Sequence, residues 1–164
     1  MNVWGIVGWK NSGKTGLMER LVAEFTARGF KVSTIKHAHH TFDVDQPGKD
    51  SHRHRVAGAS EVLLASRKRW ALMHELRDED EPDLEPLLAK LSPVDLVLVE
   101  GFKTEAHQKI EANRAATGQP LLAREDTPVR AVASDASPEG LNVPVLDLDA
   151  TGAIADFIQA ELWL

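Results

Sequence analysis

The sequence predicts an α/β fold, a mostly parallel β-sheet flanked by helices, within a single domain that spans residues 1–164. Between residues 3 and 35, an apolar run, a glycine-rich loop, a helical pattern and a second apolar run follow one another. This order is typical of a βαβ crossover, which joins parallel strands. Residues 94–99 form an apolar run without alternation, as expected of a central strand covered on both faces. Residues 152–163 carry apolar side chains at helical spacing and are expected to close the domain.

The elements between these segments follow from local patterns. Apolar side chains recur at helical spacing over residues 17–25, and Gly29 stands where this helix is expected to end. A short helix is expected to begin after Lys49, with Asp50 or Ser51 as its cap. The other expected elements are hairpin strands at 61–65 and 70–74, a short helix at 84–91, and strands near 108–113, 129–133 and 143–148. The hairpin forms an insertion over residues 59–76.

Composition and charge exclude several classes of protein. The chain has no cysteine, which rules out a disulfide framework, a cysteine nucleophile and thiolate metal sites. Its 19 Lys and Arg against 25 Asp and Glu give a net charge of −6, so no nucleic-acid partner is expected. No apolar run reaches the ~18 residues of a membrane span, and the N-terminus lacks the pattern of a signal peptide. We therefore expect a cytoplasmic protein without membrane contact.

Residues 8–15 fit the phosphate-binding pattern G-x-x-x-x-G-K-[ST]. The glycines Gly8 and Gly13 let backbone N–H groups turn toward phosphate oxygens. Lys14 adds a positive charge at the β- and γ-phosphates, and Thr15 offers a hydroxyl to Mg²⁺. The pattern follows a strand and opens a helix, which is the context the mechanism requires. The alternative is an ordinary glycine turn at a helix start.

Such loops work with an acid at the end of a second apolar strand, where it helps to hold Mg²⁺. Glu100 closes the most apolar strand of the chain, whereas Asp95 stands at its beginning. Ligands bind at the carboxyl ends of parallel strands, so we favour Glu100. Lys14 and Glu100 are the candidate catalytic residues, and Thr15 and Glu100 the candidate metal ligands. A solvated acid at a strand end is the competing interpretation of Glu100.

Five of the seven histidines fall within residues 37–54. One interpretation is a transition-metal site, because imidazole suits nickel, copper and zinc. A second is recognition of a phosphorylated partner or nucleotide by Lys36 and His37, with Asp43 or Asp45 near Mg²⁺ or its waters. A solvated loop rich in histidine is the third.

A carboxylate can select guanine, which presents two adjacent N–H donors that adenine lacks. The strand at 129–133 is followed by such a carboxylate, Asp135, and this residue is the candidate guanine reader. A turn-forming aspartate after a strand is the alternative.

Five stretches together resemble the molybdopterin-guanine dinucleotide biosynthesis protein B family, MobB. They occur in this order: G-W-K-N-S-G-K-T-G-L, I-K-H-A-H-H-T-F-D-V-D-Q-P-G-K-D-S, S-R-K-R-W-A-L-M, L-V-L-V-E-G-F-K and A-V-A-S-D. The resemblance covers residues 3 to 158. The long second stretch is far more specific than the phosphate loop, which many nucleotide-hydrolysing families share.

The resemblance implies a P-loop NTPase-like protein that binds GTP with Mg²⁺ and hydrolyses it weakly. It implies an accessory role to the guanylyltransferase that joins GMP to molybdopterin, and a homodimer in which β elements pair between subunits. By position, it assigns phosphate binding to Asn11, Ser12, Gly13, Lys14 and Thr15. It also places Asp45 and the turn Ser66, Arg67, Lys68 and Arg69 at or near the nucleotide.

Two alternatives remain open at this point. A small-molecule kinase would need a lid with arginines and an acceptor pocket, which residues 36–60 could provide. A metallochaperone GTPase would use the histidine-rich stretch.

Trp9 follows the first glycine of the loop, where a dimeric class of phosphate-loop proteins has a lysine. No water-positioning glutamine is evident either, so slow hydrolysis is expected.

Overall fold

The computed structural model describes residues 1–38, 42–125 and 128–164. The chain forms two compact units, one of residues 1–37 and 84–164, the other of residues 38–83. Each unit is described by itself.

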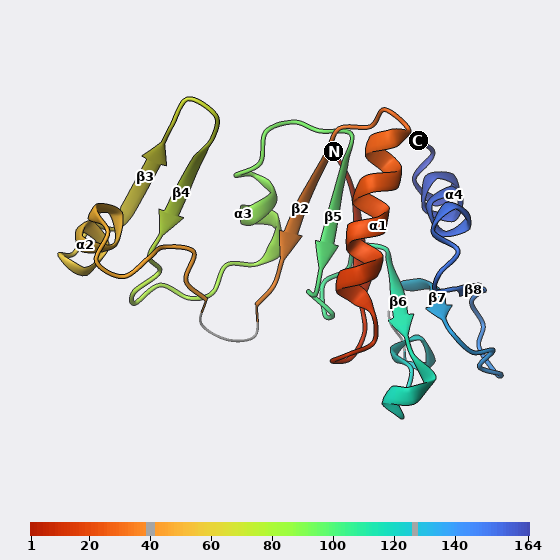
Figure 1. Ribbon diagram of the computed structural model, residues 1–164. Coiled ribbons are helices and arrows are strands. Elements are labelled where there is room, and N and C mark those ends of the chain that lie inside the picture. Colours follow the sequence, from red (N-terminus) through yellow and green to blue (C-terminus); the bar gives the residue numbers. More distant parts are fainter. Residues whose placement is uncertain (39–41, 126–127) are drawn as a thin grey trace. The chain divides into compact units, whose positions relative to one another are not determined.

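The first unit is built on a six-stranded sheet in the order β2-β5-β1-β6-β7-β8, in which every neighbouring pair is parallel. All six carboxyl ends therefore lie along one edge, where the loop between β1 and α1 also begins (Figure 1). The strands are β1 Asn2–Val7, β2 Val32–Lys36, β5 Leu96–Glu100, β6 Lys109–Asn113, β7 Val129–Ser134 and β8 Val145–Asp147. The predicted α/β fold with a mostly parallel sheet is confirmed.

Helices cover both faces of this sheet. Alternate side chains of β1 and β5, such as Trp4, Ile6 and Leu98, pack with the buried faces of α1 and α4 into the main core. On the opposite face, Val97 and Val99 pack against Leu84 of α3. The helical elements are α1 Lys14–Ala27, α3 Leu84–Leu88, α4 Thr151–Leu162 and two 3-10 turns, η1 Ala115–Thr117 and η2 Leu122–Arg124.

The second unit contains α2 Asp50–Val56 and an antiparallel hairpin of β3 Glu61–Ala65 and β4 Trp70–His74. The strands lie at the predicted residues. Val62, whose register partner is Met73, is buried, whereas Leu63 and Trp70 on the other face are 60% and 65% exposed. The hairpin thus has an uncovered apolar face within its unit.

The predicted cap of α2 was wrong. The residue at the cap position is Lys49, and its side chain makes no capping hydrogen bond. The Ser51 hydroxyl donates instead to the Asp45 carboxylate, 2.8 Å away. Among the helices of the described residues, none combines the length and the apolar character needed to cross a bilayer.

Candidate nucleotide-phosphate site

The loop between β1 and α1 has the backbone of a phosphate cradle. Gly8, Asn11 and Gly13 have positive φ angles of 143°, 63° and 94°. A Cβ on Gly8 would lie only 2.4 Å from the Ala112 carbonyl oxygen and 2.5 Å from the Ser12 Oγ. Gly8 is therefore required both by conformation and by the close approach of β6.

The Ser12 side chain indicates that this loop binds a ligand. Its side chain is 2% exposed, and its Oγ has no hydrogen-bond partner in the described structure. A buried hydroxyl without a partner costs free energy. A phosphate oxygen in the loop would accept this hydrogen bond, so the orphaned hydroxyl fits an anionic ligand.

Lys14 begins α1 and points back over the loop. Its ammonium donates to the Trp9 carbonyl at 2.6 Å. Burial lowers the pKa of Lys14, the nearby Glu100 opposes this, and the like charges of Lys103 and Lys36 lower it further. An added anion between these cations would relieve their repulsion.

Glu100 lies beside the loop, as predicted. Its register partner on β1 is Ile6, two residues before Gly8, and its side chain is mostly buried. The Lys36 ammonium forms an ion pair with its Oε1 at 3.3 Å. Asp95 lies instead at the other end of β5, where its carboxylate accepts the backbone N–H of Lys31 at 2.7 Å.

His37 is next to Glu100 through the backbone, since its N–H donates to the Glu100 carbonyl at 2.9 Å. The His37 ring lies 4.9 Å from the ring of Phe102, measured between centroids. Lys36 and His37 thus lie beside Glu100 at the carboxyl end of β2. The structure brings both to the edge where the sequence predicted them.

Asp135 follows β7 and lies beside Arg114, which follows β6. The Asp135 Oδ1 accepts the Ala115 N–H at 2.8 Å, and its Oδ2 lies 3.6 Å from an Arg114 nitrogen. Arg114 in turn reaches the phosphate loop, since its Nε would lie 3.2 Å from a Cβ on Gly13. The carboxylate therefore links the ends of β6 and β7 in this structure, and its role as guanine reader stays a prediction.

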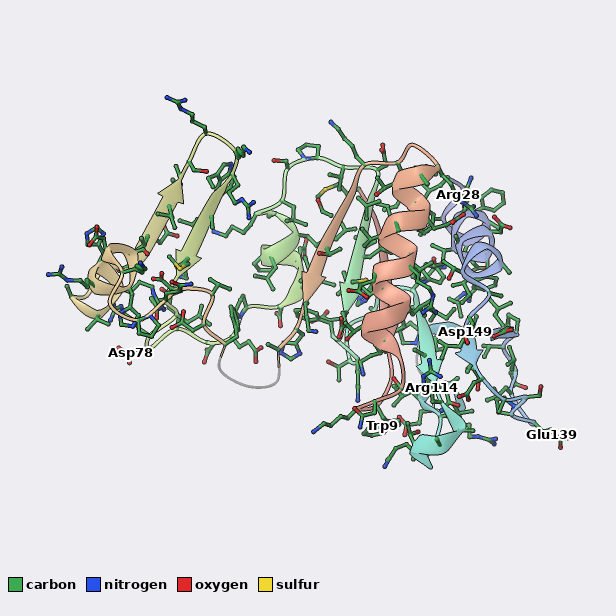
Figure 2. The ribbon with its side chains drawn as sticks, viewed as in Figure 1. Trp9, Arg28, Asp78, Arg114, Glu139 and Asp149 are labelled. Atoms are coloured by element: carbon green, nitrogen blue, oxygen red, sulfur yellow. The ribbon has the colours of Figure 1, made fainter. Side chains whose placement is uncertain are left out.

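Sequence reasoning missed Arg114 and the buried Asn113 before it. The Asn113 Oδ1 accepts the Ser134 hydroxyl at 3.0 Å, which joins the ends of β6 and β7. Their position directly at the carboxyl end of a parallel strand could have indicated them as candidate site residues. A depression of about 470 Å³ lies between the phosphate loop and this segment, lined by Trp9, Lys10, Asn11, Arg114, Ala116, Thr117 and Gln119. Figure 2 labels Trp9 and Arg114 at this end of the sheet.

Asp45 and the basic turn belong to the second unit. The Asp45 carboxylate accepts the Ser51 hydroxyl and lies 3.4 Å from Arg55 Nε, and its side chain is 6% exposed. The turn closes on itself, because the Ser66 hydroxyl donates to the Arg69 carbonyl at 3.0 Å. The side chains of Arg67, Lys68 and Arg69 are exposed. Nucleotide contacts by these residues stay a prediction.

The histidine-rich stretch shows no metal centre in its described part. His39, His40 and Thr41 lie outside the described residues. Within the ranges 1–38, 42–125 and 128–164, no group of three or more His, Asp or Glu side chains is arranged to hold a metal ion.

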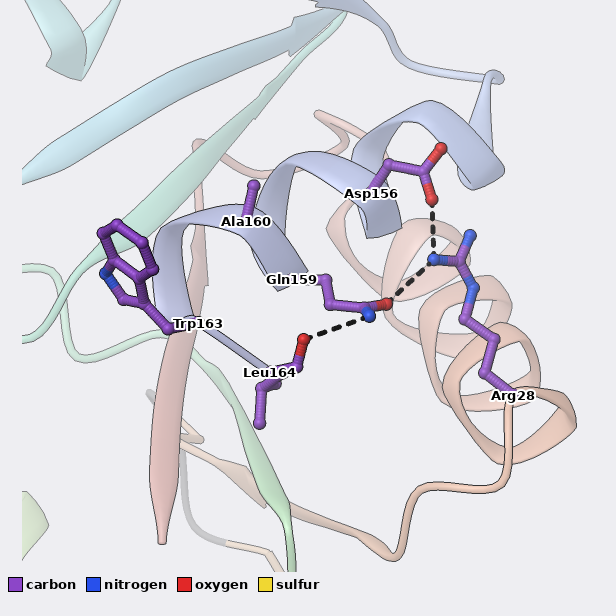
Figure 3. A pocket seen from close by; sticks show the side chains of 6 residues that line it. All are labelled: Arg28, Asp156, Gln159, Ala160, Trp163 and Leu164. Atoms are coloured by element: carbon purple, nitrogen blue, oxygen red, sulfur yellow. Dashed lines mark hydrogen bonds and ion pairs between the residues drawn. The ribbon is translucent and has the colours of Figure 1, made fainter.

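A second depression, of about 640 Å³, lies where α1 and α4 end (Figure 3). Its polar groups pair with one another: Arg28 donates to Asp156 at 2.7 Å and to Gln159 at 3.2 Å. Gln159 donates in turn to the carbonyl of Leu164. The charge of this hollow is internally compensated, so it is a poor candidate for a phosphate site.

The geometry at the phosphate loop suits a polyanion. Lys14 lies within electrostatic reach of two further cations, Lys36 and Lys103, and of one carboxylate, Glu100, which pairs with Lys36. The first turn of α1 adds the positive end of a helix dipole. Thr15, in that turn, and Glu100 are the residues present that could hold Mg²⁺.

A family model for molybdopterin guanine dinucleotide synthesis protein B, MobB, matches residues 3–135. The chain belongs to the MobB family. A molybdopterin-guanine dinucleotide biosynthesis adapter protein of Escherichia coli K12 is 46% identical over 92% of this chain and 87% of its own length. An adapter protein of the same description from Haemophilus influenzae is 44% identical over 98% of this chain and 88% of its own length.

Solved MobB structures share the fold. A MobB homolog from Bacillus stearothermophilus has a TM-score of 0.73 and 31% identity, over 99% of both chains. Bacillus subtilis MobB has a TM-score of 0.78 at 23% identity, over 99% of this chain and 98% of that one. The arrangement of a P-loop NTPase-like sheet with an added hairpin is therefore that of MobB proteins.

Proposed function

We propose that this MobB-family chain is a GTP-binding adapter in molybdopterin-guanine dinucleotide biosynthesis. It assists a guanylyltransferase that attaches GMP to molybdopterin, and it hydrolyses GTP at most slowly. The observation that carries the nucleotide site is the orphaned Ser12 hydroxyl, buried in a loop whose cations outnumber its one acid. The adapter role is supported by the relatives that share 44–46% identity.

In this proposal the loop residues Gly8, Asn11, Ser12 and Gly13 surround the phosphates, and Lys14 neutralises them. GTP would supply the phosphate charge that these groups lack. Thr15 and Glu100 would hold Mg²⁺. Lys36, which pairs with Glu100 in this structure, would then be available to a phosphate oxygen, beside His37.

Guanine selection by Asp135 requires its carboxylate to turn from Arg114 to the base. This exchange gives up the ion pair at 3.6 Å, which is longer than a strong charge-assisted hydrogen bond, and the hydrogen bond from the Ala115 N–H at 2.8 Å. Arg114 would be released toward the phosphates, since it already lies beside Gly13.

Nucleotide binding to the purified full chain tests the site. Lys14→Ala is expected to weaken GTP binding at least tenfold without lowering the melting temperature, because among the described residues the Lys14 ammonium donates only to a loop carbonyl. Asp135→Asn is expected to weaken GTP more than ATP. Retained GTP affinity in Lys14→Ala would remove the phosphate-loop assignment, and an unchanged GTP-to-ATP ratio would remove Asp135 as the base reader.

The adapter role needs a separate experiment. Tagged protein is expected to capture the guanylyltransferase, and to capture more of it in the presence of GTP and Mg²⁺. Stoichiometric phosphorylation of a small acceptor by GTP would instead support the kinase alternative. Tight binding of nickel or zinc that is lost when His37, His39 and His40 are all replaced by alanine would support the metallochaperone.

A further inference from the structure

Lys103 lies against the phosphate loop from a distant part of the sequence. After β5 the chain turns at Gly101 and Phe102, whose φ angles are +97° and +52°. This turn brings the Lys103 ammonium to 4.0 Å from the centroid of the Trp9 ring. Trp9 is the second residue of the loop, and its carbonyl accepts the Lys14 ammonium. Lys103 therefore belongs to the same charged cluster as Lys14.

The backbone around Lys103 is held in place by hydrogen bonds from a buried lysine. Lys109, at the start of β6, is fully buried. Its ammonium donates to the carbonyls of Phe102 and Lys103, each at 3.1 Å, and to the carbonyl of Glu105. Three charge-assisted hydrogen bonds hold the segment after β5 in place. The Lys103 side chain can turn while its backbone stays.

The contact of the Lys103 ammonium with the Trp9 ring is weaker than a bond to a phosphate oxygen would be. A lysine on an indole ring is held only by a weak cation–π attraction at exposed sites. Lys103 is also repelled by Lys14, whose pKa it lowers. A phosphate oxygen offers a stronger, charge-assisted bond and neutralises both lysines.

The order of the strands indicates which phosphate lies nearest. Asp135 and Arg114 follow β7 and β6, on one side of β1, whereas Glu100 ends β5 and Lys103 follows it, on the other side. A nucleotide with its base at Asp135 and its phosphates in the loop after β1 points its terminal phosphate toward β5.

We propose that Lys103 reads the terminal phosphate: it leaves the Trp9 ring and pairs with the γ-phosphate of a bound nucleoside triphosphate. The site then distinguishes triphosphate from diphosphate. This inference rests on the proposed nucleotide site and adds to it a residue that determines which phosphorylation state is bound.

The test compares GTP and GDP, each with Mg²⁺, by titration calorimetry on the full chain. Lys103→Met is expected to weaken GTP about tenfold and GDP less than twofold, because only GTP has the γ-phosphate. Lys31→Met is the control, since this exposed lysine precedes β2 at the opposite edge of the sheet. It should leave both affinities unchanged.

Tryptophan emission gives a second readout. GTP is expected to change the emission of the wild-type protein more than GDP does, and Trp9→Phe should remove that difference. Equal weakening of GTP and GDP in Lys103→Met, or no weakening of either, overturns the inference while the nucleotide site stands. A wild-type protein that binds neither nucleotide overturns the proposed function itself.

Discussion

Ser12 and Ser134 are two buried serines at the same edge of the sheet, 2% and 3% exposed, with opposite hydrogen-bonding states. The Ser134 hydroxyl donates to Asn113 Oδ1 and accepts the Ala136 N–H, whereas the Ser12 hydroxyl has no partner in the described structure. Folding thus satisfies one hydroxyl and leaves the other in need of a ligand. This difference indicates a structural role for Ser134 and, under the proposed function, a binding role for Ser12.

Replacing each serine by alanine should separate the two roles. Ser12→Ala is expected to leave the free energy of unfolding unchanged or to raise it, and to weaken GTP binding several-fold, because it deletes an unsatisfied buried group. Ser134→Ala should lower the free energy of unfolding by about 1 kcal/mol. Chemical denaturation without nucleotide measures the free energy of unfolding of both variants. Titration calorimetry measures the GTP affinity of Ser12→Ala. A clear loss of stability in Ser12→Ala would mean that its hydroxyl has a structural partner.

At the scale of an element, the segment between β5 and β6 is packed with two basic side chains, the half-buried His107 within it and the fully buried Lys109 at the start of β6. Lys109 holds its carbonyls, and His107 lies beside it with both ring nitrogens lacking a hydrogen-bond partner in the described structure. Burial, and to a lesser extent the charge of Lys109, lower the pKa of His107 to about 4. Gly5 faces this ring, since a Cβ there would lie 2.5 Å from the His107 Nε2. The segment therefore packs on β1 with a neutral imidazole.

This imidazole predicts an acid-sensitive stability. Between pH 6.5 and about 4 the unfolded chain takes up a proton on His107 and the folded chain does not, so the free energy of unfolding falls as the pH falls. Above pH 6.5 both states are neutral, and the contribution is constant. Denaturant midpoints at several pH values should show a shallower decline for His107→Leu than for the wild type. The exposed His54 offers the control, because His54→Gln should keep the wild-type slope.

The hairpin shows which features of the fold local sequence patterns can predict. Two five-residue strands around a four-residue turn were predicted at their observed bounds, because the turn residues and the flanking apolar runs are both local signals. The cap of α2 was not, because the Ser51 hydroxyl is taken by Asp45. The roles of Lys109 and Arg114 depend on which strands become neighbours, and a single sequence does not contain that order. The phosphate loop and Glu100 could be found because a spacing and a strand end specify them.

At the scale of the whole molecule, the uncovered face of the hairpin favours a second copy as its partner. Leu63, Trp70 and Leu72 share this face and are 60%, 65% and 42% exposed. An apolar face of this kind, with unpaired strand edges, is typical of an interface. We expect the protein to form a homodimer through it.

Light scattering after size exclusion measures this directly. The wild type is expected at twice the mass of its 18.0 kDa chain, and the double variant Leu63→Lys, Trp70→Lys at the mass of one chain. Val56→Lys is the control, since Val56 is 73% exposed on α2, outside the hairpin, and should keep the dimer. A wild-type monomer, or a dimer that survives the double variant, contradicts the prediction.

The sheet order also sets when the chain can fold during its synthesis. β1 is made first, yet its partners are β5 and β6, and Asn2 pairs with Leu96. The ribosome must therefore release more than half of the chain before the first strand finds a neighbour. The hairpin needs only residues close in sequence and can form early, whereas β6, whose Ala112 carbonyl lies close to Gly8, is made much later. The edge of the sheet that carries the loop between β1 and α1 is thus completed late, after β6 has emerged.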